Sequence, residues 1–274
     1  MEPPHWKSHA GRWQHIGPPL RPCAEDVARL KTWVHELEPA ANGRLETLLL
    51  GVTPEFANAD FTPPLRLVAV DQSESMIAQV WPGDTATRRA VRGDWLDLAL
   101  PAASFELAIG DGCLSMFDFT EGYRNFSRSI ARVLRPNAHF ALRLYCVLEQ
   151  AEAVAQVFDA LWSRRIGNFH VFKWRLAMAL ISDVATRSVR LSDIWQSYCE
   201  HVPDPAELAQ RTGFPLAEVL TMDSYRDSAS AYSFPLAEEA VATLSEDFEL
   251  RDSYRSGYEL GERCPLLWLR RRST

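Results

Sequence analysis

Three aspartates stand where short apolar runs end, and each could hold a polar ligand by accepting hydrogen bonds. Asp71 follows the apolar run in "LVAVDQSESMI", Asp94 lies in "RGDW", and Asp111 lies in "AIGDG". An ionised carboxylate only accepts hydrogen bonds, which makes it a compact partner for a pair of hydroxyl groups. Each aspartate, taken alone, also fits a helix cap or a turn.

The segment "ETLLLGVTPEF" (46–56) runs from an apolar stretch into a turn with one glycine, Gly51. A dinucleotide site needs the spacing G-x-G-x-x-G here, so that a pyrophosphate can rest on a helix N-terminus. This turn lacks the later glycines, and Glu55 would repel a phosphate. The turn therefore argues against an NAD-dependent oxidoreductase.

Apolar runs alternate with helical segments between residues 45 and 145, after a first amphipathic helix at 24–37. We expect strands at 45–50, 65–70, 89–92, 105–112 and 139–145, and helices at 73–81 and 120–134. Strands separated by helices over about 100 residues indicate a parallel sheet with helices on both faces.

The pattern changes after residue 145. Helical periodicity dominates 146–230 without strand-like alternation, and strand patterns return at 248–256 and 264–272. We therefore expect four parts: an N-terminal arm and helix (1–44), an α/β core (45–145), a helical insertion (146–230), and terminal strands that complete the sheet (231–274).

Taken together, these stretches resemble the class I S-adenosylmethionine-dependent methyltransferases over residues 45–145, with a weaker similarity in the terminal hairpin. The resemblance implies a doubly wound, mostly parallel seven-stranded sheet, a Rossmann-like methyltransferase fold with a helical insertion before a terminal antiparallel hairpin. It also implies S-adenosylmethionine as the cofactor, whose sulfonium cation is compatible with Glu55, Asp71 and Asp111.

The resemblance assigns cofactor contacts residue by residue. Asp71 would accept hydrogen bonds from both ribose hydroxyls, Asp94 would bond the adenine amino group, and Trp95 would flank the adenine ring. Gly110 and Asp111 would lie beside the methionine moiety. The complete predicted set is Gly51, Thr53, Pro54, Glu55, Asp71, Gln72, Met76, Asp94, Trp95, Gly110, Asp111, Gly112, Trp13 and Arg21.

The first loop departs from the family pattern of an acid followed by G-x-G-x-G. Leu49 replaces the acid, while Thr53 and Glu55 replace the second and third glycines. One explanation is a rebuilt loop, in which Pro54 fixes the path and Glu55 or Thr53 bonds the amino-acid end of the cofactor. The other is a degenerate site in a non-catalytic binding or regulatory protein.

Two further segments have competing interpretations. The histidines His5, His9 and His15, interleaved with Trp6 and Trp13, fit a solvated arm; the resemblance instead implies a lid over the cofactor, with Trp13 and Arg21 at the pocket mouth. The run "GNFHVFKWR" fits a packed helix; the resemblance implies an acceptor pocket lined by His170, Trp174 and Arg175.

The amino-acid composition limits the classes of binding partner that the protein can have. Of 274 residues, 47 % are hydrophobic and 24 % charged, which is typical of a globular protein with a full core. The net charge of −7 argues against a nucleic-acid partner. The five cysteines lack metal-ligand spacing, and Cys113 has no sequence neighbour to activate it. No signal or membrane-spanning segment is evident, so we expect a cytoplasmic protein that binds no metal and no membrane.

We therefore expect a methyltransferase that acts on an O, N or C nucleophile of a small molecule. A hydroxyl acceptor would need a general base. Tyr145, His139 and His170 are the candidates. The acceptor and the oligomeric state are not readable from the sequence.

Overall fold

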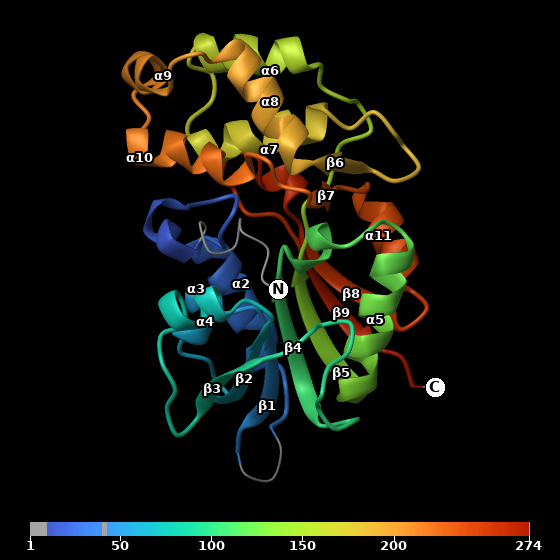
Figure 1. Cartoon of the computed structure of the whole chain (residues 1–274). Helices are drawn as coiled ribbons and strands as arrows, with labels where there is room; N and C mark the ends of the chain where they lie inside the picture. The colour runs from blue at the N-terminus through green and yellow to red at the C-terminus, as the bar shows by residue number, and fades with distance from the viewer. Residues whose placement is uncertain (1–9, 40–42, 274) are drawn as a thin grey trace.

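A seven-stranded mixed sheet with helices on both faces forms the centre of the molecule (Figure 1). The computed structural model describes residues 10–39 and 43–273. The strands are β1 (Leu45–Leu50), β2 (Leu65–Asp71), β3 (Arg88–Arg92), β4 (Phe105–Asp111), β5 (Leu134–Arg143), β8 (Phe248–Tyr254) and β9 (Leu266–Arg271). Their order is β3-β2-β1-β4-β5-β9-β8, with β1 to β5 parallel and β9 antiparallel to both its neighbours. The predicted fold class is confirmed.

The central strands are apolar on both sides because both faces of the sheet are covered. In β1, Leu48 and Leu50 pack toward one face, and Leu45 and Leu49 toward the other. Helices α5 (Glu121–Val133) and α11 (Ala237–Leu244) cover the first face. The second is covered by α2 (Ala24–His35), α3 (Pro54–Ala57) and α4 (Glu74–Gln79). Such two-sided burial favours near-continuous apolar runs, which the sequence shows.

The order of the parallel strands reverses its direction at β1, in the middle of the sheet. From β1 the chain moves outward to β2 and β3, whereas β4 and β5 lie on the other side of β1. The reversal opens a crevice beyond the carboxyl ends of β1 and β4, where ligands bind in open α/β sheets. The fold thus positions Gly51, Asp71 and Asp111 around one crevice.

A helical layer lies beyond the carboxyl edge of the sheet (Figure 1). It consists of α6 (Val154–Trp162), α7 (Phe169–Ala179), α8 (Leu191–His201), α9 (Pro205–Thr212), α10 (Leu216–Val219) and the 3-10 helix η3 (Leu220–Tyr225). Leu161, Phe172 and Ile194 belong to a core of its own, and none is exposed. Helix α9 follows its sequence signals closely: the Asp204 carboxylate accepts the Ala206 N–H at 2.8 Å, and Gly213 ends the helix with φ 83°.

Two sequence expectations need correction. Strand β6 (Ser188–Arg190) lies in the region 146–230 that was expected to be helical, and it forms a two-stranded ribbon with β7 (Ala231–Ser233) just beyond that region. Three-residue strands are too short to show an alternating pattern. Strand β5 begins at Leu134, directly after α5, rather than at His139, because Leu134 already pairs with Phe105 of β4. Over the described ranges, no helix is long and apolar enough to cross a bilayer.

Candidate functional site

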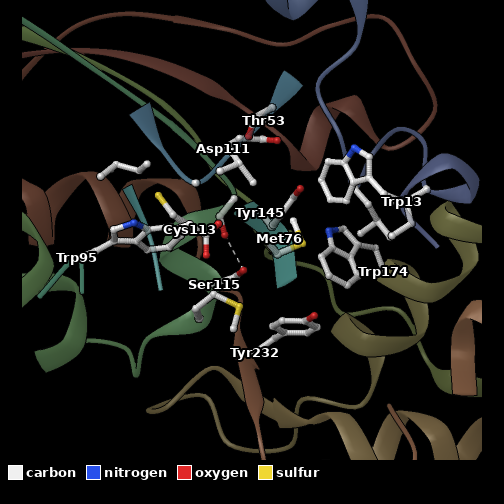
Figure 2. Close-up of a pocket in the computed structure, with 18 of the residues that line it drawn as sticks. Trp13, Thr53, Met76, Trp95, Asp111, Cys113, Ser115, Tyr145, Trp174 and Tyr232 are labelled. Atoms are coloured by element: carbon white, nitrogen blue, oxygen red, sulfur yellow. Dashed lines mark hydrogen bonds between the residues drawn. The ribbon is translucent and has the colours of Figure 1, made fainter. Parts of the chain in front are cut away.

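A cavity occupies the crevice between the sheet and the helical layer (Figure 2). The empty space amounts to about 770 Å³ when the part that opens to solvent is included. Its walls come from the N-terminal arm, the carboxyl ends of four parallel strands, and the helical layer. The lining residues are Trp13, Ile16, Leu20, Leu50, Gly51, Val52, Thr53, Asp71, Met76, Trp95, Asp111, Gly112, Cys113, Ser115, Met116, Tyr145, Trp174, Tyr225 and Tyr232.

The turn after β1 keeps its one glycine where space is needed. Gly51 has φ 90°, and a Cβ there would project toward Trp95, Asp71 and Thr53 at 3.8–4.0 Å. Gly51 thus leaves an open cradle between an aromatic ring, a carboxylate and a hydroxyl group. The chain then enters α3 with Pro54 at its first position. Further glycines are unnecessary because the backbone turns away from the cavity into this short helix.

Asp71 and Trp95 form the next part of the wall. Asp71 is 8 % exposed, and its Oδ1 accepts the Ser73 N–H at 2.8 Å. Ser73 caps α4 by accepting the Met76 N–H at 3.0 Å. Trp95 donates its indole N–H to the Val70 carbonyl at 2.7 Å, which fixes its ring across the end of β2. A carboxylate and a flat ring therefore flank the same opening.

A buried arginine connects the carboxyl ends of β4 and β5. Arg143 is fully buried and donates from Nε to Asp111 Oδ1 at 2.5 Å. It also donates to the Tyr145 hydroxyl at 3.1 Å, the Tyr258 hydroxyl at 2.9 Å and the Pro19 carbonyl at 2.8 Å. Burial lowers the pKa of Arg143, but the adjacent Asp111 carboxylate outweighs it and the pKa lies well above the ordinary value. The guanidinium therefore stays charged.

The N-terminal arm crosses the cavity mouth and is fastened to the first loop. The Arg21 guanidinium lies 4.8 Å from the centroid of the Trp13 ring and donates to the Trp13 and Ile16 carbonyls at 3.1 and 3.2 Å. Its Nε donates to Glu55 at 2.6 Å. Arg21 and Glu55 thus bind each other, and this pair holds Trp13 against the cavity.

The helical layer contributes an aromatic wall centred on Trp174. The Trp174 ring meets Tyr145, Tyr232 and Phe234 edge to face, with centroids 5.1, 5.1 and 5.4 Å away. Tyr232 in turn meets Tyr225 at 5.9 Å. Edge-to-face contacts of this kind hold rings in fixed orientations. The wall is therefore built before any ligand arrives.

The structure divides the predicted cofactor residues into two groups. Those that line the cavity are Trp13, Gly51, Thr53, Asp71, Met76, Trp95, Asp111 and Gly112. Those outside the lining are Arg21, Pro54, Glu55, Gln72, Asp94 and Gly110. Gln72 and Asp94 are exposed, and Asp94 accepts the Leu96 N–H at 2.9 Å in a turn of its own. At Gly110 a Cβ would come 2.9 Å from Cys113 Sγ, so this glycine serves packing.

Only Tyr145 among the three candidate bases lines the cavity. Burial raises the pKa of Tyr145 well above its ordinary value, although the charge of Arg143 opposes the shift. The phenol therefore keeps its proton and can donate a hydrogen bond but cannot serve as a base at neutral pH.

The two histidines lie elsewhere. His139 stacks on Trp268 with centroids 4.6 Å apart, and burial with Arg270 and Arg251 lowers its pKa to about 4. His170 donates from Nε2 to the His15 carbonyl at 2.8 Å, and burial and Lys173 lower its pKa to about 3. Both positions contradict a direct role for these rings at the cavity.

The remaining candidates from the sequence have other partners or lie outside the structure. Arg175 pairs with Glu152 and is absent from the lining. His5, His9 and Trp6 lie outside the described residues. Burial raises the pKa of Cys113 far above its ordinary value, so this thiol is inert, as expected. The part of the chain that the structure describes holds no group of three His, Cys, Asp or Glu suited to a metal ion.

Sequence reasoning missed Arg143 and part of the aromatic wall. Arg143 carried a signal, because a charged residue interrupts the buried run "HFALRLY" and stands in register with Asp111 on the neighbouring strand. Tyr225 and Tyr232 carried none. They lie about 80 residues after the core, and only the tertiary fold brings them to Tyr145.

Comparisons with known proteins agree with this architecture. Residues 51–142 match the family model of a methyltransferase domain. A search of the curated proteins found no match. Matching solved structures include a chain from a complex between the Haloferax volcanii Trm112 methyltransferase activator and a methyltransferase, with a TM-score of 0.56, 11 % identity, and 100 % of both chains covered.

Two further structures share the fold. A protein of Rhodobacter sphaeroides described as a zinc-dependent alcohol dehydrogenase has a TM-score of 0.57 and 11 % identity, covering 97 % of this chain and 98 % of the other. A protein of Pyrococcus horikoshii has a TM-score of 0.50 and 14 % identity, covering 95 % and 98 %. At these identities the likeness concerns the fold alone.

Proposed function

We propose that the chain, whose residues 51–142 match a methyltransferase domain, is a class I S-adenosylmethionine-dependent methyltransferase that methylates a small-molecule acceptor bound in the cavity beside the cofactor. Bound S-adenosylmethionine would supply a methyl group on a sulfonium sulfur; a lone pair of the acceptor would form the new bond to the methyl carbon as the sulfur departs as a neutral thioether. The protein's task is to hold both molecules in line and to exclude water. Such positioning can lower a barrier by roughly 7–11 kcal/mol.

The residues around the cradle suit the proposed cofactor. Asp71 would accept hydrogen bonds from the ribose hydroxyls, and the Trp95 ring would cover the adenine. The open space beside Gly51 would admit the amino-acid end, close to Asp111. Asp71 and Asp111 are the only charged residues in the described lining; Arg143 pairs with Asp111 from outside the lining, so Asp71 supplies the net negative charge that suits a sulfonium cation. This match supports the rebuilt first loop over the degenerate one.

The proposed transfer uses no general base from the described lining. No histidine or lysine is among those residues, Tyr145 keeps its proton, and the carboxylates of Asp71 and Asp111 accept hydrogen bonds from the Ser73 N–H and from Arg143. Tyr145 accepts a hydrogen bond from Arg143, so its own proton can be donated to an acceptor oxygen or nitrogen. The acceptor nucleophile would carry a free lone pair, and any proton it releases would pass to solvent.

One observation carries the proposal: Asp71 borders the space that Gly51 leaves empty. We expect S-adenosylhomocysteine to bind with a micromolar Kd in calorimetry. Asp71→Ala should weaken binding roughly 100-fold, because two hydrogen bonds to a charged group are lost. Asp97→Ala, an exposed acid outside the lining, is the matched control and should change the Kd less than twofold. Absence of binding at millimolar concentration would overturn the proposal.

A further inference from the structure

The cavity has two chemically different halves. Gly51, Asp71 and Asp111 lie at the sheet side, whereas Trp174, Tyr232 and other rings form the opposite side. Figure 2 shows Trp13, Trp174 and Tyr232 grouped across the cavity from Trp95. The proposed function assigns the sheet side to the cofactor. The aromatic side is then left for the molecule that receives the methyl group.

Two indole N–H groups on the aromatic side lack a hydrogen-bond acceptor. The Nε1 atoms of Trp13 and Trp174 are buried and have no partner among the described residues. Trp174 is only 3 % exposed, and in Figure 2 its nitrogen faces the middle of the cavity. A buried unpaired donor costs about 1–3 kcal/mol of stability. By contrast, the indole nitrogens of Trp33 and Trp95 donate to Asp252 and to the Val70 carbonyl at 3.0 and 2.7 Å.

The charge of the cavity restricts which ligands can reach these indole N–H donors. Asp71 would repel an anionic acceptor, and no cation is among the described lining residues; the second acid of the lining, Asp111, is already paired with the buried Arg143. The buried ammonium of Lys173 lies 4.4 Å from the ring centroid of Tyr225, which lines the cavity, but Lys173 itself is outside the lining. Flat aromatic walls favour a planar guest, because stacked and edge-to-face contacts need a π-face.

We propose that the methyl acceptor is a flat, uncharged aromatic or heteroaromatic molecule whose oxygen or nitrogen accepts a hydrogen bond from the Trp174 indole N–H. This inference rests on the proposed function. It narrows the acceptor from any small molecule to a planar neutral one.

The test measures binding of probe molecules to protein saturated with S-adenosylhomocysteine. The neutral planar probes are coumarin, chromone and 4-quinolone. The comparison probes are benzoate, which is planar and anionic, and cyclohexanone, which is neutral but not planar. We expect at least one neutral planar probe to bind at least tenfold more tightly than either comparison probe, by calorimetry or ligand-observed NMR.

Two tryptophan variants locate the contact. Trp174→Phe keeps a ring and removes the N–H, and should raise the Kd of the bound planar probe about 5–10-fold, a loss of about 1–1.4 kcal/mol. Trp195→Phe is the control, because its N–H faces Asp223 at 3.5 Å outside the lining. It should change the Kd less than twofold. Both variants should keep the wild-type Kd for S-adenosylhomocysteine, which also shows that they fold.

The outcomes separate the two proposals. Failure of S-adenosylhomocysteine to bind the wild-type protein overturns the proposed function. If S-adenosylhomocysteine binds, the inference is overturned by benzoate or cyclohexanone binding as tightly as the planar neutral probes, or by none of the planar probes binding. Equal effects of Trp174→Phe and Trp195→Phe would also reject the assigned hydrogen bond.

Discussion

Arg143 holds together groups that are distant in the chain. It meets Asp111, Tyr145, Tyr258 and the Pro19 carbonyl, all from a side chain with no exposed surface. A buried charge is tolerated when its partners satisfy it, and removal of one partner leaves the other uncompensated. The ion pair with Arg143 therefore holds the Asp111 side chain in position at the cavity, in addition to any effect on stability.

Arg143→Met should lower the free energy of unfolding by about 3–5 kcal/mol, because Asp111 is left as an unpaired buried carboxylate. The double variant Arg143→Met with Asp111→Asn removes that charge and should recover part of the loss. Urea unfolding of the three proteins measures both changes. Additive losses in the double variant would show that the pair is not coupled.

Gly112 tests how closely Tyr145 packs against the chain. An added Cβ would lie 2.3 Å from the Tyr145 ring, and Gly112 has φ 62°. Gly83 has φ 95° and open space around it, so Gly83→Ala carries the backbone strain alone. We expect Gly83→Ala to destabilise by about 1–2 kcal/mol, and Gly112→Ala by about 1–3 kcal/mol more. Equal melting temperatures for the two variants would contradict the close packing.

Lys173 is buried without an ion-pair partner among the described residues, and its pKa is lowered to about 7 by burial and by Arg12. Below pH 7 the folded and unfolded states both carry the charge, so the full burial penalty applies. Between pH 7 and 10.5 the folded state loses the proton and the unfolded state keeps it. The stability of the wild-type protein therefore gains from rising pH in this window.

Lys173→Met removes that penalty, so it should stabilise the protein most at pH 6. Its advantage should shrink by roughly 2–3 kcal/mol between pH 6 and pH 9, as measured by urea unfolding at both values. Lys31→Met, on α2, is the control and should shift stability by less than about 0.5 kcal/mol at either pH. An advantage that grows with pH would reverse the sign argued here.

At the scale of elements, a half-buried ion pair is one of the contacts that hold the arm in place. Arg21 stacks on Trp13 and pairs with Glu55, and the same arrangement recurs where Arg29 lies 4.9 Å from the Trp33 ring centroid and pairs with Asp252. The two clusters are chemically alike, but only the first touches a residue that lines the cavity. They form a natural comparison.

Arg21→Ala should raise the Kd for S-adenosylhomocysteine about 3–10-fold, because Trp13 loses its support at the cavity mouth. Arg29→Ala should leave that Kd within twofold. Both substitutions remove an arginine that pairs with one acid and stacks on one indole ring, so similar melting temperatures are expected. An equal loss of affinity in the two variants would show that the arm does not cover the cofactor.

The elements of the core were predictable because local signals and tertiary demands coincide there. The apolar runs of β1, β2 and β4 are long enough to identify, and the strands lie within a residue or two of their expected bounds. The ribbon of β6 and β7 was not predictable, since its pairing joins Val189 to Tyr232 across more than 40 residues. Such pairing depends on the helical layer that encloses it.

At the scale of the whole molecule, sheet topology predicts only those site residues that lie on the sheet side of the cavity. Asp71 and Gly51 follow strands of the parallel sheet, so topology alone places them at one edge. Glu55 and Arg21 were expected to face the cofactor and instead bind each other. The sequence motif predicts the position of the Glu55 carboxylate. Its ion-pair partner, Arg21, comes from the N-terminal arm, which carries no motif.

The Pro19 carbonyl, held by Arg143 at 2.8 Å, also bears on turnover. In the proposed function, a ligand beneath Trp13 would leave only after the arm lifts, and lifting would break a charge-assisted hydrogen bond worth about 1.5–3 kcal/mol. We expect such a contact to lengthen the residence time of the spent cofactor by roughly 10–150-fold. Departure of the by-product, rather than the chemistry, would then limit each cycle.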